Sequence, residues 1–274
     1  MKPVAFEYVR ARDLDSALAA LREGGEASRP LAGGQSLGPM LNLRLARPAL
    51  LVDIGRIAAL RQVERRGDVW HLGAGVTHAM VEDGAGGLDG MPAAVARTIA
   101  YRAVRNRGTV GGSLAHADPA ADWLLALAAM DARVVARLGR ESREIAVTAL
   151  ATGAFATCLA PGELLTGIRI PALSPAARWG YAKACRKAGE FADAASAVVM
   201  DATRGCARIV LGALGGPPRL IDGGAALLER ATGPDALPLL REAVARAAPE
   251  LDAVDVALQA GTLARALSQA RSPR

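Results

Sequence analysis

Two short glycine-containing segments carry the residue types that can bind a phosphate group. They are Ala32-Gly33-Gly34-Gln35-Ser36-Leu37 and Arg107-Gly108-Thr109-Val110-Gly111-Gly112-Ser113-Leu114. Adjacent glycines can take positive φ angles that turn successive backbone N–H groups toward one point, and the missing Cβ leaves room for close approach. The neighbouring serine and threonine hydroxyls can add further donors. Together the two segments predict a site that holds a diphosphate from both sides.

Neither segment matches a standard nucleotide-binding motif. The glycines are not followed by GK[ST], as in a Walker loop, and neither segment contains GxGxxG. Taken singly, each segment is also compatible with a tight turn in which glycine serves only the backbone geometry. The prediction therefore depends on the pair.

The elements expected around the first segment alternate between strand and helix. Asp13 can cap the start of a helix that Gly24–Gly25 would end. The expected order is a strand at 4–9, this helix, a short strand at Leu31–Ala32, a helix with Pro39 in its first turn and a buried strand at 50–54.

The pattern continues around the second segment. Before it, we expect a strand from 69 to 72, a helix capped by Thr77 and a helix from 93 to 101. The segment itself is expected to be a glycine-rich turn at 108–112. It should be followed by a helix that Asp118 caps and that runs to 130, and by a strand at 134–136. Three prolines between 161 and 175 mark a boundary near residue 172.

The remainder reads as a second, α+β domain. Strands are expected at 195–200 and 209–213, and helical segments near Asp222, Pro234 and Ala253. The predicted domains are 1–172, with subdomains of about 1–55 and 56–172, and 173–274.

Composition favours a globular protein with a packed core, since 51% of the 274 residues are hydrophobic. The net charge of +6 is small, and the densest basic stretch, Arg102 to Arg107, has no aromatic neighbour beyond Tyr101. We therefore expect no nucleic-acid partner. No apolar run reaches membrane-spanning length and the amino terminus does not resemble a signal peptide, so we expect a cytoplasmic protein without membrane insertion.

The cysteines argue against a metal centre in this chain. Cys158, Cys185 and Cys206 are far apart and form no CxxC pair, and the three histidines show no ligand spacing with them.

Three segments resemble the FAD-binding medium subunit of the carbon monoxide dehydrogenase and xanthine dehydrogenase group of molybdenum hydroxylases. They are AGGQSL at 32–37, RNRGTVGGSLAHADPAAD at 105–122 and YAKACRKAGEFADAASAVVM at 181–200, and the likeness runs from about Phe6 to Asp222. The resemblance implies an α+β protein with the two-subdomain FAD-binding fold of the p-cresol methylhydroxylase and vanillyl-alcohol oxidase type. A smaller carboxy-terminal α+β domain, an antiparallel sheet with helices, would follow.

The resemblance also implies how FAD would be held, without a covalent bond. Residues Ala32 to Ser36, with Leu37, and Thr109 to Ser113 would wrap the pyrophosphate. Asp122 would lie near the ribose or adenine half, and the backbone of Leu165 would meet the nucleotide. Lys183 would lie near the isoalloxazine, where its charge favours the reduced flavin; the alternative is a solvated strand lysine.

Three other residues allow more than one interpretation. Asp118 is either a helix cap or a ligand contact. Tyr181 is a core aromatic, which we favour, or a ring-stacking residue. His116 lies beside the second segment without an acid and nucleophile set, so we expect a structural role.

In the resembling complexes, molybdopterin is bound by a large subunit and two [2Fe–2S] clusters by a small one. The chain is therefore expected to take electrons from the small subunit and pass them to an external acceptor, within a dimer of heterotrimers. Two alternatives stay open: a stand-alone flavin-dependent oxidase, and a non-redox protein that binds a nucleotide or a partner.

The last segment departs from the family. A Tyr-Arg pair is usual in the final helix, but Leu258 to Arg265 contains none, and Gly261 should weaken that helix by about 1 kcal/mol relative to alanine. This departure puts the family's subunit contact through the helix in doubt.

Overall fold

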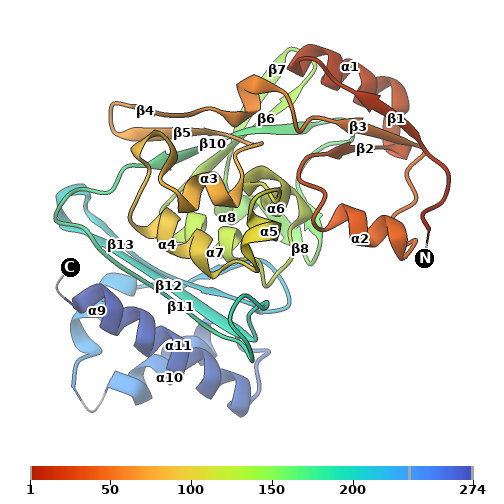
Figure 1. The fold of residues 1–274 in the computed structure, drawn as a ribbon. Helices are drawn as coiled ribbons and strands as arrows, with labels where there is room; N and C mark the ends of the chain where they lie inside the picture. Colours follow the sequence, from red (N-terminus) through yellow and green to blue (C-terminus); the bar gives the residue numbers. More distant parts are fainter. Residues whose placement is uncertain (1, 234–235, 273–274) are drawn as a thin grey trace.

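The structure is a computed structural model that describes residues 2–233 and 236–272. It contains three main sheets, which follow one another along the chain (Figure 1). The predicted α+β class is confirmed.

The amino-terminal part is a small parallel sheet with two helices. Its strands have the order β1-β3-β2, and both outer strands run parallel to β3. The elements are β1 (Glu7–Arg10), α1 (Leu14–Gly24), β2 (Ser28–Leu31), α2 (Leu37–Asn42) and β3 (Leu50–Asp53). Asp13 caps α1 as predicted, and Ser16 completes a capping box.

The middle part is a five-stranded antiparallel sheet with helices on one face. Its order is β4-β5-β10-β6-β7. The strands are β4 (Val63–Arg66), β5 (Val69–Gly73), β6 (Arg133–Leu138), β7 (Glu141–Ala146) and β10 (Leu164–Pro171), with the short pair β8 (Ala151–Gly153) and β9 (Ala156–Thr157). The helices are α3 (His78–Glu82), α4 (Met91–Thr98), α5 (Arg102–Arg105), α6 (Val110–His116), α7 (Asp122–Ala129) and α8 (Val147–Leu150).

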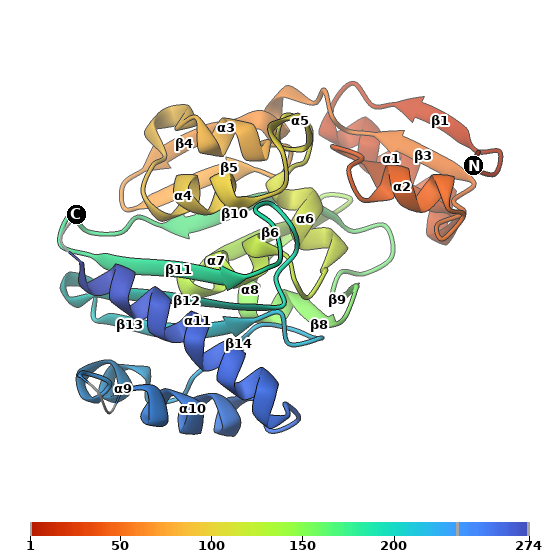
Figure 2. The same cartoon turned by 60° about the horizontal axis from the view of Figure 1, so that its bottom comes forward.

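The carboxy-terminal part is a four-stranded antiparallel sheet, β11-β12-β13-β14, with α9 to α11 on its outer face (Figure 2). The strands are β11 (Arg178–Ala184), β12 (Ala194–Asp201), β13 (Cys206–Gly212) and β14 (Arg219–Leu220). The helices are α9 (Gly224–Arg230), α10 (Ala236–Ala247) and α11 (Ala253–Arg271). The helix start predicted near Pro234 lies outside the described residues.

The core consists of three clusters, one for each sheet. Every residue of α7 is buried, because this helix lies in the cluster that joins the middle sheet to β12 and β13. A helix that is apolar all round needs such cover on every side. The middle and carboxy-terminal parts therefore share a continuous interior across residue 172, and the boundary predicted there stays a prediction.

Several predicted elements are shifted. The strand expected at Leu31–Ala32 lies at 28–31, and the helix expected from 93 to 101 ends at Thr98. The helix expected to begin at Asp118 begins at Asp122, with Ala121 at its N-cap, so Asp118 is not the cap. The Asp118 carboxylate instead accepts a hydrogen bond from the Ala120 amide at 2.9 Å, which forms a turn before the helix.

Helix α11 continues without interruption through Gly261, and a Cβ at this position would meet no atom within 4 Å. We expect Gly261→Ala to stabilise the protein by about 1 kcal/mol, since alanine has the higher helix propensity. Thermal unfolding should show a melting temperature about 2–4 °C higher. Gly180→Ala is the opposite control, because its Cβ would lie 1.8 Å from the Ala266 carbonyl oxygen of the same helix.

No helix in the described ranges has both the length and the apolar character needed to cross a membrane.

Candidate functional site

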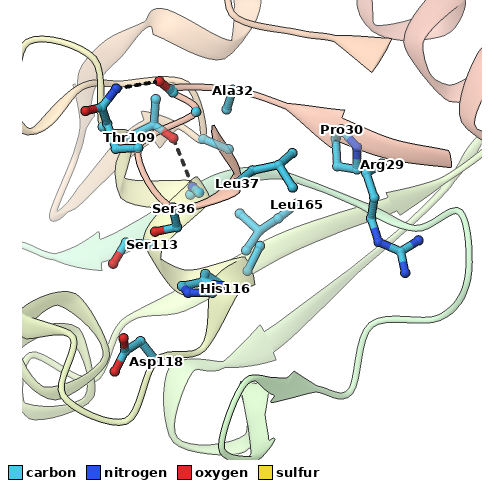
Figure 3. A pocket seen from close by; sticks show the side chains of 18 of the residues that line it. Arg29, Pro30, Ala32, Ser36, Leu37, Thr109, Ser113, His116, Asp118 and Leu165 are labelled. Atoms are coloured by element: carbon cyan, nitrogen blue, oxygen red, sulfur yellow. Dashed lines mark hydrogen bonds between the residues drawn. The ribbon is translucent and has the colours of Figure 1, made fainter. Parts of the chain in front are cut away.

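The two glycine segments meet at one cavity of about 900 Å³ (Figure 3). The prediction that they share a cleft is confirmed. Twelve of the fourteen predicted site residues line this cavity: Ala32, Gly33, Gly34, Gln35, Ser36, Leu37, Thr109, Gly111, Gly112, Ser113, Asp122 and Leu165.

The first segment connects the end of β2 to the start of α2 and leaves its amides available. None of the described residues accepts a hydrogen bond from the backbone N–H groups of residues 33 to 37. Gly34 has a φ angle of +71°, a conformation that favours glycine. The Gln35 side chain folds back and donates a hydrogen bond to the Gly33 carbonyl at 3.1 Å. Unpaired amides beside a cavity are suited to an anion, because they retain their full hydrogen-bonding capacity for it.

Close packing, more than positive φ, requires the other glycines. A Cβ at Gly33 would lie 2.1 Å from the Arg107 carbonyl oxygen, so the first segment rests directly on the backbone of the second. A Cβ at Gly111 would lie 2.5 Å from that of Ala74, and one at Gly112 would lie 2.7 Å from Thr109 Oγ1. The expectation of positive φ at paired glycines holds for Gly34 only.

The second segment was expected to be a glycine-rich turn and is instead the first turn of α6. Thr109 is the N-cap, and its hydroxyl accepts from the Gly112 amide at 3.0 Å. The amides of Val110, Gly111 and Ser113 donate to backbone carbonyls at 2.9–3.0 Å. Of the amides of residues 109 to 113, only that of Thr109 has no acceptor among the described residues, so the first segment offers more free amides than the second.

Val110 and Lys183 do not line the cavity. The Val110 side chain is fully buried in the core. Lys183, on β11, places Nζ 2.8 Å from Asp122 Oδ1 and 3.1 Å from the Thr98 carbonyl oxygen, and its side chain is only 8% exposed. Lys183 is therefore not a solvated strand lysine.

This ion pair joins two of the predicted site residues. Asp122 was expected near the ribose or adenine half and Lys183 near the isoalloxazine. The ion pair brings the two charged groups within 2.8 Å of each other, and of the two only Asp122 lines the cavity. Both assignments stay predictions.

Tyr181 is a core residue, as favoured, with 8% of its surface exposed. Its hydroxyl donates to Asp122 Oδ1 at 2.5 Å. His116 and Asp118 both line the cavity, and the His116 ring lies 5.1 Å from that of Phe155.

Sequence reasoning missed both ends of the cavity. One end is bounded by Ile99, Ala100 and the β11–β12 connection at 189–191, and the other by residues from α1, η1 (Gly25–Ala27) and β2 that include Glu26 and Arg29. These residues are separated by up to 170 positions, and no local pattern marks them as neighbours.

Two arginines of the basic stretch, Arg102 and Arg105, are paired within the protein. Arg102 forms ion pairs with Glu82 and Asp83, and Arg105 forms one with Glu82 at 2.8 Å. Arg105 also donates to the carbonyls of Ile99 and Ala100, so it holds the wall of the cavity.

His78 is hydrogen-bonded to the backbone of the second segment. Its backbone amide donates to the Gly108 carbonyl at 2.9 Å, and its Nδ1 accepts from Trp123 Nε1 at 2.9 Å. The ring is therefore neutral, with its proton on Nε2. Burial is the main cause that lowers the pKa of His78, to about 4.

This pKa predicts acid sensitivity. Between pH 6.5 and 4 the unfolded chain binds a proton at residue 78 that the folded protein does not, so stability should fall as the pH falls. A difference of about 2.5 between the two pKa values corresponds to about 3 kcal/mol. Thermal unfolding at pH 7 and pH 4.5 should show a larger loss for the parent chain than for His78→Gln, which retains an acceptor for Trp123. Parallel pH profiles for the two proteins would contradict this prediction.

Comparison with known proteins gives consistent matches. A family model described as the FAD binding domain in molybdopterin dehydrogenase matches residues 4–173. The 6-hydroxypseudooxynicotine dehydrogenase complex subunit alpha of Paenarthrobacter nicotinovorans is 38% identical over 79% of this chain and 74% of the relative. The caffeine dehydrogenase subunit beta of Pseudomonas sp. (strain CBB1) is 36% identical over 80% and 76%.

Solved structures extend the likeness to nearly the whole chain. A chain of carbon monoxide dehydrogenase from Hydrogenophaga pseudoflava superimposes with a TM-score of 0.87 at 30% identity, over 98% of both chains. A chain of quinoline 2-oxidoreductase from Pseudomonas putida 86 gives 0.84 at 28%, again over 98% of both. These matches confirm the predicted fold, including its carboxy-terminal part.

Proposed function

The chain belongs to the family of FAD-binding domains in molybdopterin dehydrogenases, and from this premise we propose that it is the electron-transferring flavin subunit of a molybdenum hydroxylase complex. In this role it takes electrons from the [2Fe–2S] clusters of a small subunit and delivers them to an external acceptor. A large subunit binds molybdopterin and the substrate.

The observation that carries the proposal is the row of unpaired amides at residues 33–37 in the shared cavity. They fit a diphosphate, because an anion without a nearby lysine needs several N–H donors that converge on it. The Ser36 and Ser113 hydroxyls line the same cavity, and neither has a hydrogen-bond partner among the described residues (Figure 3). A dinucleotide with its diphosphate here would extend into both ends of the cavity.

The residues of this chain bind and orient the cofactor and exclude water from it. Bound FAD supplies the ability to exchange electrons singly or in pairs, as a link between one-electron clusters and an acceptor requires. The backbone of Arg107 and Gly108 supports the first segment at Gly33. Leu165, which is 3% exposed, contributes an apolar wall.

The distribution of metal ligands supports partner subunits. The three cysteines are free, and no group of three or more His, Cys, Asp or Glu side chains in the described part of the chain could hold a metal ion. The proposed assembly is a dimer of heterotrimers in the cytoplasm. The substrate is selected in the large subunit, so this chain does not determine it.

Spectroscopy of the purified full-length chain tests the cofactor. We expect visible flavin bands that dithionite bleaches, present on isolation or after reconstitution with FAD. A chain that never acquires these bands is not a flavoprotein subunit, and the non-redox alternative would replace the proposal.

Co-purification tests the assembly. A tagged chain produced in its native host should bring down two further chains, with molybdenum and iron found by elemental analysis. Recovery of a flavin-loaded chain without partners or metals would favour the stand-alone oxidase.

A further inference from the structure

The Asp122 carboxylate is held entirely through one of its oxygens. Tyr181 Oη lies 2.5 Å, Lys183 Nζ 2.8 Å and Thr98 Oγ1 3.2 Å from Oδ1. The donors Tyr181 and Lys183 come from β11, whereas Asp122 begins α7. The single Thr98 hydroxyl proton, at the end of α4, has its shorter bond to the Val95 carbonyl at 2.8 Å. The carboxylate therefore joins two elements that are distant in sequence.

The second oxygen of Asp122 remains available. Of the described side chains, none donates a hydrogen bond to Oδ2, and Oδ2 is not among the fully buried atoms that lack a partner. Asp122 lines the cavity, although the residue is only 7% exposed. An acceptor that is buried, charged and open on one side has a strong tendency to take up a donor from a ligand.

The donors on Oδ1 are well placed to fix this orientation. Tyr181 is buried, and its backbone amide donates to Gln269 Oε1 of α11 at 2.9 Å, which holds the strand. Burial is the main cause that raises the pKa of the Tyr181 hydroxyl well above its usual value, so the group remains a proton donor. Lys183 is equally enclosed, with 8% of its side chain exposed.

We propose that Tyr181 is a positioning residue of the cofactor site: with Lys183 it holds Asp122 Oδ1, so that Oδ2 accepts a hydrogen bond from an N–H or O–H group of the bound flavin nucleotide. The inference rests on the proposed function. It assigns the carboxy-terminal sheet a role in cofactor binding, because Tyr181 and Lys183 of β11 would act through Asp122. The donor is a ring N–H of the flavin, a sugar hydroxyl or the adenine amino group.

The test compares FAD binding by the full-length parent chain and Tyr181→Phe, by quenching of FAD fluorescence. We expect the dissociation constant to rise about tenfold, with the melting temperature of the FAD-free protein nearly unchanged. A shift in the visible spectrum of the bound flavin would identify a ring N–H as the donor, and an unshifted spectrum with the same loss of affinity would place the donor outside the ring, on a sugar hydroxyl or the adenine amino group. Tyr8→Phe is the matched control, because Tyr8 also donates to an aspartate, Asp53, which does not line the cavity.

If Tyr181 acts by positioning Asp122, the effect of Tyr181→Phe on FAD affinity should require Asp122; if its role is structural, it should not. In an Asp122→Asn background, Tyr181→Phe should cause little further loss of affinity, whereas a general loosening of the fold would add to the first loss. Lys183→Met removes the other donor to the same oxygen and should weaken FAD binding in the same direction, which keeps the test available if Tyr181→Phe does not fold. An affinity that neither variant changes, or losses that add, would overturn the inference. If the parent chain itself binds no FAD, the proposed function fails, and the inference with it.

Discussion

Gly33→Ala is expected to weaken FAD binding by at least about 100-fold. The added Cβ would lie 2.1 Å from the Arg107 carbonyl oxygen and 2.8 Å from Gly108 Cα. These are backbone atoms, so the clash cannot be relieved by rotation of a flexible side chain, and the two segments must separate. Loss of two amide-to-phosphate hydrogen bonds, at about 1.5 kcal/mol or more each, accounts for a factor of this size. Titration of the protein with FAD, followed by flavin fluorescence, measures it.

Gly38, in the helix α2 that follows the first segment, provides the control. A Cβ at Gly38 meets nothing within 4 Å, so Gly38→Ala should leave the FAD affinity within about twofold of the parent value. Circular dichroism of both FAD-free variants would verify that they fold. Near-parental affinity in a folded Gly33→Ala would mean that contact between the two segments is not needed to hold the diphosphate.

Gly33 also illustrates what the sequence revealed and what it did not. Its glycine pair and the neighbouring hydroxyl residues indicated a phosphate site, and the second segment indicated the partner, because both are local patterns. The reason for the glycine was different from the one expected. Only Gly34 needs its φ angle, whereas Gly33 is required by a backbone 74 residues further along the chain. Contacts of this range leave no mark in the local sequence.

The second segment shows a similar limit. Paired glycines with low helix propensity suggested a turn, yet they form the first turn of α6 because Thr109 caps it and because the Val110 and Gly111 amides bind carbonyls of the β5–α3 connection. Tertiary hydrogen bonds overrode the local preference. As a result, most of the free amides belong to the first segment.

Asp122 and Lys183 were both identified as site residues, but not as partners of each other. Each was recognised by its own motif, and the two motifs are 61 residues apart. Their contact depends on where the side chains of β11 meet the first residue of α7, which the apolar pattern of either element does not specify. The resemblance to a family pointed to both residues, but only the folded structure shows that they form an ion pair with each other.

The Asp122–Lys183 pair is expected to have the largest effect on stability. The two side chains are 6% and 8% exposed, so removal of either partner leaves a charge in an environment of low dielectric. We expect Lys183→Met and Asp122→Asn each to reduce the free energy of unfolding by about 3 kcal/mol. The double variant should be less destabilised than the sum of the two, by about 2 kcal/mol, because it leaves no unpaired charge. Urea unfolding of the four FAD-free proteins measures this coupling.

An exposed ion pair serves as the control that shows whether burial causes the large loss of stability. Arg66 and Glu64 are also paired, at 2.7 Å, but their side chains are 65% and 46% exposed. Water screens this pair, so Arg66→Met and Glu64→Gln should each cost less than about 1 kcal/mol and show little coupling. The two pairs should also differ in salt dependence, because ions reach only the exposed one. If the Asp122–Lys183 cycle gave values as small as those of the exposed pair, solvent would have to enter between α7 and β11, and the carboxylate could not be held in one orientation toward the cavity.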